Sequence, residues 1–396
     1  MHNQLNPTSS LSKPYIDYYN AQGIIPTRQD LTDINGFVFR RNYLYKTLGI
    51  PLTSLKGRNI IEFGPGGGFN ASATTYFEPE SYVFVDATSA SLEELKRKQA
   101  AGIFKAKNIE IIQSNIFDYC DERKYDLVIC EGVIPCQNDP RGMLRHVGSF
   151  CNKGGILITT TMTATSLLSE ICRRVFRPSI VSLNKTFAEQ TQICKKLFNS
   201  HFDLDGVKRR PIEDWAQDMI LHDWHMGEYV FTITDSISAL EKDFEYYSSS
   251  PRFLIDDRWY KKVSETSVTV NDLLDQQYVA VNTFLLDTRV PLKDVLQIKD
   301  SVKLSLIEPL CKSVCVIHDK IMQENSFDRL EDFITALKEL SATLPEEFEV
   351  TKISIHDFIS GIRKFAMGEE NADFDSFKKW WGRGQQYISF INKQLR

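Results

Sequence analysis

The sequence predicts an α/β fold with a doubly wound, mostly parallel sheet. Two observations predict this fold: five short apolar segments alternate with stretches of helical periodicity, and the first segment runs directly into a glycine-rich loop. Strands that alternate with helices form parallel sheets with right-handed crossovers, and such sheets bind ligands beyond the carboxyl ends of their strands. The predicted strands span residues 60–63, 82–86, 109–114, 125–130 and 154–159, with predicted helices at 91–100 and 141–150.

The loop after the first strand is the strongest local signal. The strand carries one acidic residue, Glu62, and continues into Gly64, Gly66 and Gly68. Glycines at a strand end permit positive φ angles and a close approach of the backbone to a ligand, which the amides of the next helix then face. The spacing predicts a site for a nucleoside-type cofactor, with a purely structural turn as the alternative. The dinucleotide fingerprint requires Gly or Ala where this chain has Phe69.

The second predicted strand ends in a carboxylate, Asp86, 22 residues after Gly64. An open α/β sheet places an acid at this point to bind the two hydroxyls of a ribose. The alternative is that Asp86 caps the following helix.

From about residue 57 to residue 161 the chain resembles the class I S-adenosylmethionine-dependent methyltransferases. Five stretches match that family's motifs in the right order, namely 62–68, the acid at 86, 114–118, 125–132 and 152–157. The resemblance implies a Rossmann-like, mostly parallel seven-stranded sheet whose final strand runs antiparallel. One departure is Asn115, where many members carry Asp; its amide oxygen can still accept a hydrogen bond from an adenine amino group.

The resemblance also implies S-adenosyl-L-methionine as the cofactor and a set of residues that bind it. The glycine loop would lie against the methionine part, and Glu62 would organise that loop or reach the ammonium group. Asp86 would hold the ribose, Asn115 and the amide of the next residue the adenine, and Glu131 would border the methyl-transfer pocket. The full set is Glu62, Gly64, Pro65, Gly66, Gly68, Asp86, Ala87, Asn115, Ile116, Glu131 and Gly132.

These residue types suit a sulfonium cofactor. Its methyl group is already activated, so the enzyme mainly supplies alignment for in-line displacement. A pyrophosphate cofactor would prefer positive or neutral surroundings, so Glu62, together with Phe69, argues against a nicotinamide-dependent oxidoreductase.

The whole-chain composition is that of a globular enzyme in a reducing compartment. The net charge of −5 and the isoelectric point near 5.9 argue against a nucleic acid as the main partner. No apolar run has the length of a membrane span, and the first residues lack the pattern of a secretory signal. Eight cysteines without a paired pattern indicate reduced thiols. We therefore expect a cytoplasmic protein with no nucleic-acid or membrane partner.

The pattern of predicted helices and strands divides the chain into three predicted domains. Residues 1–57 form an N-terminal helical cap over the site, or alternatively helices packed on the sheet flank. Residues 58–262 form the cofactor-binding domain, with a helical insertion at 162–235 and the last two strands at 244–247 and 252–255. Residues 270–396 form an all-α module, in which Pro309 should kink or break a helix. This module either packs on the catalytic domain or mediates homo-oligomer formation.

The insertion contains the candidate catalytic residues. Asp214, Asp218 and His222 recur every fourth residue after Pro211, on one face of a predicted helix. His222 or His225 could act as the general base for a hydroxyl or amine acceptor, with Asp218 orienting it. The alternatives are an ordinary solvated helix face and, least favoured, a metal site, so we predict no metal.

The function predicted from these observations is transfer of a methyl group to a small-molecule or carbohydrate acceptor, on oxygen. Two alternatives remain open. One is N- or C-methylation of a metabolite or a protein side chain. The other is a cofactor-binding scaffold whose helical module binds a protein partner.

Overall fold

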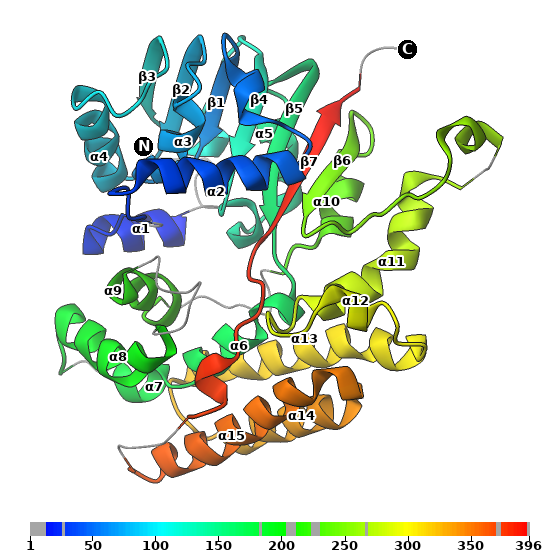
Figure 1. Cartoon of the computed structure of the whole chain (residues 1–396). Helices are drawn as coiled ribbons and strands as arrows, with labels where there is room; N and C mark the ends of the chain where they lie inside the picture. The colour runs from blue at the N-terminus through cyan, green and yellow to red at the C-terminus, as the bar shows by residue number, and fades with distance from the viewer. Residues whose placement is uncertain are drawn as a thin grey trace, which may run out of the picture. The chain divides into compact units, whose positions relative to one another are not determined.

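A computed structural model describes residues 13–25, 28–181, 184–202, 211–222, 230–265, 268–369 and 374–393. The chain forms two compact units, each assembled from separated stretches of sequence (Figure 1). Unit 1 comprises residues 1–161, 231–252 and 386–396, and unit 2 comprises residues 162–230 and 253–385. The chain therefore passes from one unit to the other four times.

Unit 1 contains a seven-stranded sheet in the order β3-β2-β1-β4-β5-β7-β6. The first five strands are parallel, whereas β7 is antiparallel to both of its neighbours. The strands are β1 (Asn59–Phe63), β2 (Ser81–Asp86), β3 (Asn108–Gln113), β4 (Tyr125–Cys130), β5 (Cys151–Thr161), β6 (Phe244–Ser250) and β7 (Gln386–Asn392). This sheet confirms the predicted fold class and all five strands expected before residue 162.

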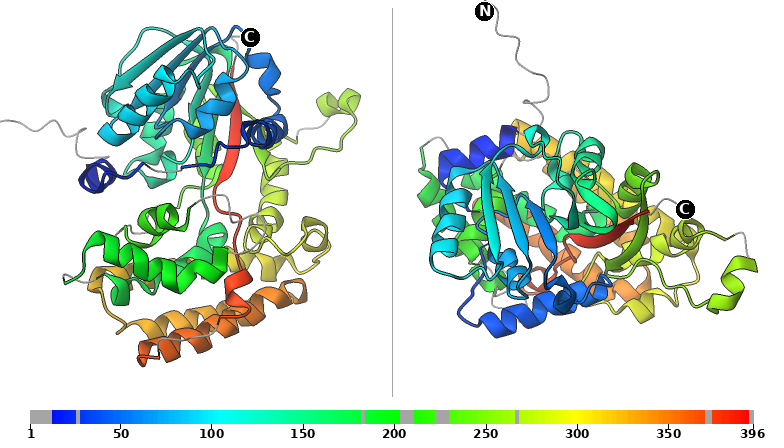
Figure 2. Two further views of the ribbon diagram at one scale, coloured as in Figure 1. Left: turned by 60° about the vertical axis from the view of Figure 1, so that its left-hand side comes forward. Right: turned by 90° about the horizontal axis from the view of Figure 1, so that it is seen from above.

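Helices cover both faces of this sheet (Figure 2). The helices of unit 1 are α1 (Lys13–Gln22), α2 (Ile34–Thr47), α3 (Phe69–Thr75), α4 (Ser89–Ala100), α5 (Pro140–Gly148) and α10 (Ile233–Leu240), with short 3-10 turns η2 (Leu52–Leu55), η3 (Ile116–Asp118) and η4 (Ile134–Cys136). On one face Ile60, Tyr82 and Leu127 of neighbouring strands pack with Tyr45 of α2 and Leu95 of α4 in one buried cluster. This packing fixes α2 against the sheet that carries the glycine loop.

The last strand of the sheet differs from the sequence prediction. Residues 252–255 were expected to form it, but they form no strand. Instead β7 comes from the end of the chain and lies between β5 and β6, drawn in red in Figure 1. Residues 270–396 are therefore not an all-α module, because their last described segment pairs with strands some 140 to 240 residues earlier, such as Asn392 with Phe244 and Ile391 with Ile156.

Unit 2 is helical. Its helices are α6 (Ala164–Arg174), α7 (Arg177–Ile180), α8 (Phe187–Phe202), α9 (Ile212–Trp215), the π-helix η5 (Ala216–Ile220), η6 (Tyr260–Glu265), α11 (Val270–Phe284), α12 (Leu292–Val295), α13 (Ser301–Glu324), α14 (Leu330–Thr343), η7 (Glu346–Phe348), α15 (Glu349–Ala366) and η8 (Phe377–Lys379). α13 runs through Pro309 without the predicted break, because its buried residues Ile307 and Cys311 hold it in the packed core on both sides of the proline. No helix in the described ranges is both long and apolar enough to cross a bilayer.

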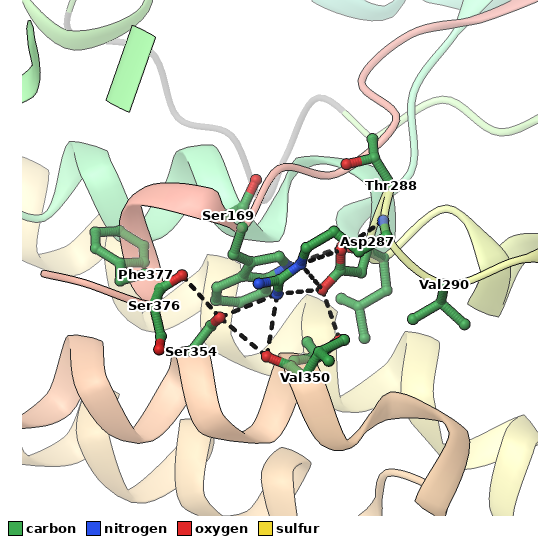
Figure 3. A network of polar contacts seen from close by, with 12 residues as sticks. Ser169, Asp287, Thr288, Val290, Val350, Ser354, Ser376 and Phe377 are labelled. Carbon is green, nitrogen blue, oxygen red and sulfur yellow. Dashed lines mark hydrogen bonds and ion pairs between the residues drawn. The ribbon is translucent and has the colours of Figure 1, made fainter. Parts of the chain in front are cut away.

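A buried carboxylate organises the segment between α11 and α12 in unit 2. Asp287 accepts hydrogen bonds from Arg289, at 2.6 Å, and from the Thr351 hydroxyl, at 2.7 Å (Figure 3). Arg289 also donates to the hydroxyl of Ser354, which in turn donates to the carbonyl of Ser376, each at 3.0 Å. This network joins the α11–α12 connection to α15 and to the segment before η8.

Candidate cofactor site

The glycine loop leaves the carboxyl end of β1 with three left-handed residues. Gly64, Gly66 and Gly68 have φ angles of +64°, +54° and +68°. At two of them a side chain would also collide with the core: a Cβ on Gly64 would lie 2.5 Å from Val133, and one on Gly68 would lie 2.5 Å from Leu95. The loop therefore requires glycine for its backbone conformation and for its packing.

Asp86 at the end of β2 is bound directly to this loop. Its Oδ2 accepts a hydrogen bond from the Gly66 amide at 3.0 Å, and its Oδ1 accepts from the amide and hydroxyl of Thr88, at 2.9 and 2.8 Å. Burial raises the pKa of Asp86, and these hydrogen bonds oppose the shift. The glycine loop and the predicted ribose-binding acid thus converge at one place. The capping alternative is not realised, because the residue before α4 is Thr88 and its side chain makes no capping hydrogen bond within the described residues.

A lysine from α4 closes the other side of the loop. Lys98 is buried, donates to the carbonyl oxygen of Gly67 at 2.7 Å and lies 3.0 Å from the ring centroid of Phe69. Burial lowers the pKa of Lys98 to about 8, opposed by the nearby carboxylate of Glu94. Phe69, which breaks the dinucleotide fingerprint, thus serves as a platform for a buried cation.

The predicted adenine-binding residues begin the turn η3 after β3. The Asn115 side-chain oxygen accepts from the Phe117 amide at 3.1 Å, so it caps that turn. The Ile116 carbonyl oxygen lies 2.8 Å from Nε2 of His146 on α5. The Ile116 side chain reaches toward Gly64, since a Cβ on that glycine would lie 3.9 Å from its Cδ1. This turn therefore lies beside the loop, as expected.

Glu131, directly after β4, is fixed by residues that the sequence did not reveal. Arg41 of α2 donates to its two carboxylate oxygens at 2.7 and 2.9 Å, Asn70 donates at 3.1 Å and Tyr45 at 3.3 Å. The side chains of Arg41 and Glu131 are only 9% and 6% exposed, so this is a buried ion pair. The Nε of Arg41 is buried and has no hydrogen-bond partner in the described part of the chain. The neighbouring Gly132 has a φ of +77°.

A second buried acid lies on the same face of the sheet. Glu62 accepts a hydrogen bond of 2.5 Å from the Tyr82 hydroxyl. Burial, reinforced by the charge of Glu131, raises the pKa of Glu62 to about 7. Tyr387 of β7 belongs to the same electrostatic cluster, because burial raises its pKa to about 12, Glu131 adds to the shift and Arg41 opposes it.

The predicted catalytic residues belong to unit 2. Asp218 lies on the π-helix η5, and His222, two residues after it ends, is 1% exposed. The predicted α-helical face is not formed, because a π-helix has wider turns and does not align every fourth residue. Arg174 donates to the carbonyl oxygen of His222 at 3.0 Å. His225 lies outside the described residues. Within the described ranges, no group of three His, Cys, Asp or Glu side chains could hold a metal ion.

Sequence reasoning missed Arg41, Tyr45, Lys98 and Tyr387 as members of this site. Arg41 and Tyr45 lie before the first strand, and Tyr387 lies on a strand expected to be helix. The segment from Tyr387 to Ile391 is rich in aromatic and β-branched residues, which is typical of a strand and could have revealed it.

Comparison with known proteins gives one domain family and several distant relatives. Residues 61–157 match the family model of a methyltransferase domain. The chain is 27% identical over 104 residues to a malonyl-[acyl-carrier protein] O-methyltransferase of Ilyobacter polytropus, covering 26% of this chain and 39% of that protein. It is 24% identical over 196 residues to a tRNA U34 carboxymethyltransferase of Campylobacter fetus subsp. fetus, covering 47% of this chain and 64% of that protein. The chain thus spans less than two thirds of either relative.

Among solved structures, PKMT2 of Rickettsia typhi is similar at 18% identity and a TM-score of 0.37, covering 62% of this chain and 50% of that one. An arsenic(III) S-adenosylmethionine methyltransferase of Chlamydomonas reinhardtii is similar at 24% identity and a TM-score of 0.25, covering 28% and 40%. The family match falls on β1 to β5, where the strand order and the glycine loop are those implied by the motifs. Residues 61–157 of unit 1 therefore carry a methyltransferase domain, and its strand order and glycine loop are those that the resemblance to the class I enzymes implies.

Proposed function

We propose that this chain binds S-adenosyl-L-methionine in unit 1 and transfers its methyl group to a small-molecule or carbohydrate acceptor, on oxygen. The observation that carries the proposal is the contact between Asp86 and the Gly66 amide, which brings the ends of β1 and β2 to one place. An adenosyl group needs a ribose-binding acid and a close-approach backbone side by side.

The charges at this end of the sheet support a cationic cofactor. Glu62, Asp86 and Glu131 supply three buried or nearly buried carboxyl groups, while Arg41 and Lys98 supply two cations. S-adenosylmethionine carries a sulfonium, an ammonium and a carboxylate, so its net positive charge complements this set. A dinucleotide pyrophosphate, with two negative charges, would face the carboxylates unfavourably.

Each of these residues has a proposed role. Glu131 provides negative potential for the ammonium group, Glu62 adds to it in its ionised form, and the uncommitted Nε of Arg41 can donate to the carboxylate of the cofactor. Asp86 holds the ribose hydroxyls, Asn115 and Ile116 lie beside the adenine, and the loop with Pro65 and Ala87 shapes the pocket. When bound, the cofactor supplies an activated methyl group, so the protein need only align an acceptor with it.

Composition, the helices after β5 and one relative support the proposed acceptor. The acidic composition disfavours RNA, and the helices that follow β5 provide extra structure for recognising a compact ligand. The relative from Ilyobacter polytropus is named as an O-methyltransferase, which agrees with methylation on oxygen. We propose Asp218, His222 and His225 as acceptor-side residues. Asp218 lies on a π-helix, a feature frequent at functional sites, and the two histidines follow it closely in the sequence.

We further propose a cytoplasmic location and self-association through the C-terminal helices. Each of the seven cysteines whose side chains are described is a free thiol, as expected in a reducing compartment. Val302 and Leu306, separated by one turn of α13, are 71% and 48% exposed and offer an apolar contact surface.

Isothermal titration with S-adenosylhomocysteine, followed by incubation of candidate extracts with isotopically methyl-labelled cofactor, tests the proposal. We expect saturable binding and an acceptor that gains the mass of one methylene group, detected by mass spectrometry. Binding without any labelled acceptor would instead support a cofactor-binding scaffold, and absence of binding would contradict the proposal. A labelled nitrogen or carbon atom would correct the acceptor assignment alone.

A further inference from the structure

A cavity of about 310 Å³ lies at the end of the sheet opposite the glycine loop. Its lining residues include Arg58, which precedes β1, Asp126 near the start of β4 and Asn152 near the start of β5. The glycine loop and Glu131, by contrast, follow the carboxyl ends of β1 and β4. The cavity therefore belongs to unit 1 but is separate from the cofactor site.

An irregularity in β5 forms one wall of the cavity. Tyr125 pairs with Cys151, but Leu127 pairs with Ile156, so β4 advances two residues while β5 advances five. Residues 152–155 have no partner on β4, and pairing with β7 begins only at Ile156. A Cβ on Gly155 would lie 2.9 Å from the Asn152 carbonyl oxygen and 3.1 Å from that of Tyr125. Because both are backbone atoms, position 155 in this wall requires glycine. This bulge is a fixed feature of the fold.

Two basic side chains in the cavity lining, Arg58 and Lys153, carry charges that no described carboxylate neutralises through an ion pair. Arg58 and Lys153 are exposed, and neither forms a side-chain hydrogen bond or an ion pair with any residue in the described ranges. Lys107 and Arg123 of unit 1, by contrast, form ion pairs with Glu80 and Glu110. Arg58 and Lys153 are therefore available to a ligand.

With Arg58 and Lys153 the lining as a whole carries a net positive charge, and the base of the cavity is apolar. Asp126 is its one acidic lining residue in the described part of the chain, and its carboxylate already accepts from the Asn59 amide at 2.9 Å and the Asn152 side chain at 3.5 Å. Ile50, Leu55 and Leu127 are at most 3% exposed and form the apolar base.

We propose that this cavity binds a small organic anion. One negatively charged group would lie between Arg58 and Lys153, and a compact apolar group would lie over Ile50, Leu55 and Leu127. A charged group at the rim with apolar packing beneath is the usual composition of a small-molecule site. This proposal does not depend on methyl transfer, since it concerns the opposite end of the sheet.

Fluorescence anisotropy with naphthalene-1-sulfonate, an anion with a compact apolar body, tests the proposal. The full chain is titrated in saturating S-adenosylhomocysteine, so that the cofactor site does not contribute. We expect saturable binding that weakens by about tenfold or more in the double variant Arg58→Gln/Lys153→Gln. The variant Lys105→Gln/Lys107→Gln removes the same charge from exposed positions outside the cavity and should leave the affinity unchanged.

Two further measurements separate the cavity from general charge effects. Ser54→Phe places a ring in the cavity lining without changing the charge, so it should also abolish binding. Neutral naphthalene-1-methanol should bind at least about tenfold more weakly than the sulfonate. Absence of sulfonate binding, equal binding of the neutral analogue, or unchanged affinity in both cavity variants would overturn the proposal. Circular dichroism confirms that the variants are folded.

Discussion

The carboxylate of Asp86 accepts a hydrogen bond from the Gly66 amide across 3.0 Å. This contact ties the end of β2 to the loop after β1, so the two most informative parts of the sequence meet in space. Asp86 is 7% exposed, and burial raises its pKa, yet three protein donors hold its oxygens. These hydrogen bonds offset part of the cost of burying the carboxylate.

Asp86→Ala should weaken binding of S-adenosylhomocysteine by about 1–3 kcal/mol, the scale of a lost charged hydrogen bond. Isothermal titration calorimetry measures the change. Asp86→Asn is the matched control: it keeps an oxygen for the Gly66 amide but lacks the charge, so its affinity should fall between those of the wild type and the alanine variant. Unchanged affinity in both variants would remove Asp86 from the site.

Arg41→Met should destabilise unit 1 by about 3 kcal/mol, because it leaves the buried Glu131 carboxylate without its cation. The double variant Arg41→Met/Glu131→Gln should recover much of this loss, since no buried charge then remains. Urea unfolding measures both. Arg363→Met removes one partner of the more exposed Arg363–Glu331 pair and should cost much less. A double variant as unstable as the single one would contradict the buried-pair interpretation.

Glu62 makes stability depend on pH in a defined direction. Its pKa of about 7 in the folded state exceeds its ordinary value of 4.5, so between these values the folded chain keeps a proton that the unfolded chain has lost. The free energy of unfolding should therefore fall as pH rises from 4.5 to 7, with a contribution from Glu62 of about 3 kcal/mol.

Glu62→Gln removes this titration and can still accept from Tyr82, so the stability of the variant relative to wild type should increase over the same pH range. Denaturant unfolding across that range measures the difference, and the exposed-site variant Glu122→Gln controls for the loss of one carboxyl group. A constant difference between Glu62→Gln and wild type would show that Glu62 does not titrate there.

His222→Ala and His225→Ala should lower turnover without raising the dissociation constant of S-adenosylhomocysteine, if these residues serve the acceptor. Turnover is measured with the acceptor found by methyl labelling, and thermal unfolding of each variant controls for stability, because His222 is buried. Wild-type turnover in both variants would assign this segment a structural role.

The meeting of the glycine loop and Asp86 was predictable from the sequence because its signals are local. A buried strand, glycines at fixed spacing and an acid at the next strand end lie within 28 residues, from Asn59 to Asp86, and their geometry follows from the strand–loop–helix unit itself. The structure places Asn115 and Glu131 at the same end of the sheet for the same reason, since each follows a parallel strand.

The features that the sequence did not predict depend mostly on contacts between segments that are distant in the sequence. Arg41 and Glu131 are 90 residues apart, and β7 pairs with β5 across more than 200 residues, so no local pattern specifies either partner. Residues 252–255 have a strand-like composition and follow β6 directly, so the sequence predicted them as the last strand of the sheet. The π-helix η5 likewise changed the face predicted for Asp218 and His222, because an α-helical period was assumed.

A crystal structure with S-adenosylhomocysteine tests the central claim most directly. The account predicts the ribose hydroxyls within hydrogen-bond distance of the Asp86 carboxylate, and the amino-acid part of the ligand against the backbone of Gly64 to Gly68. A ribose bound elsewhere, or a ligand that leaves the Asp86–Gly66 region untouched, would contradict the account.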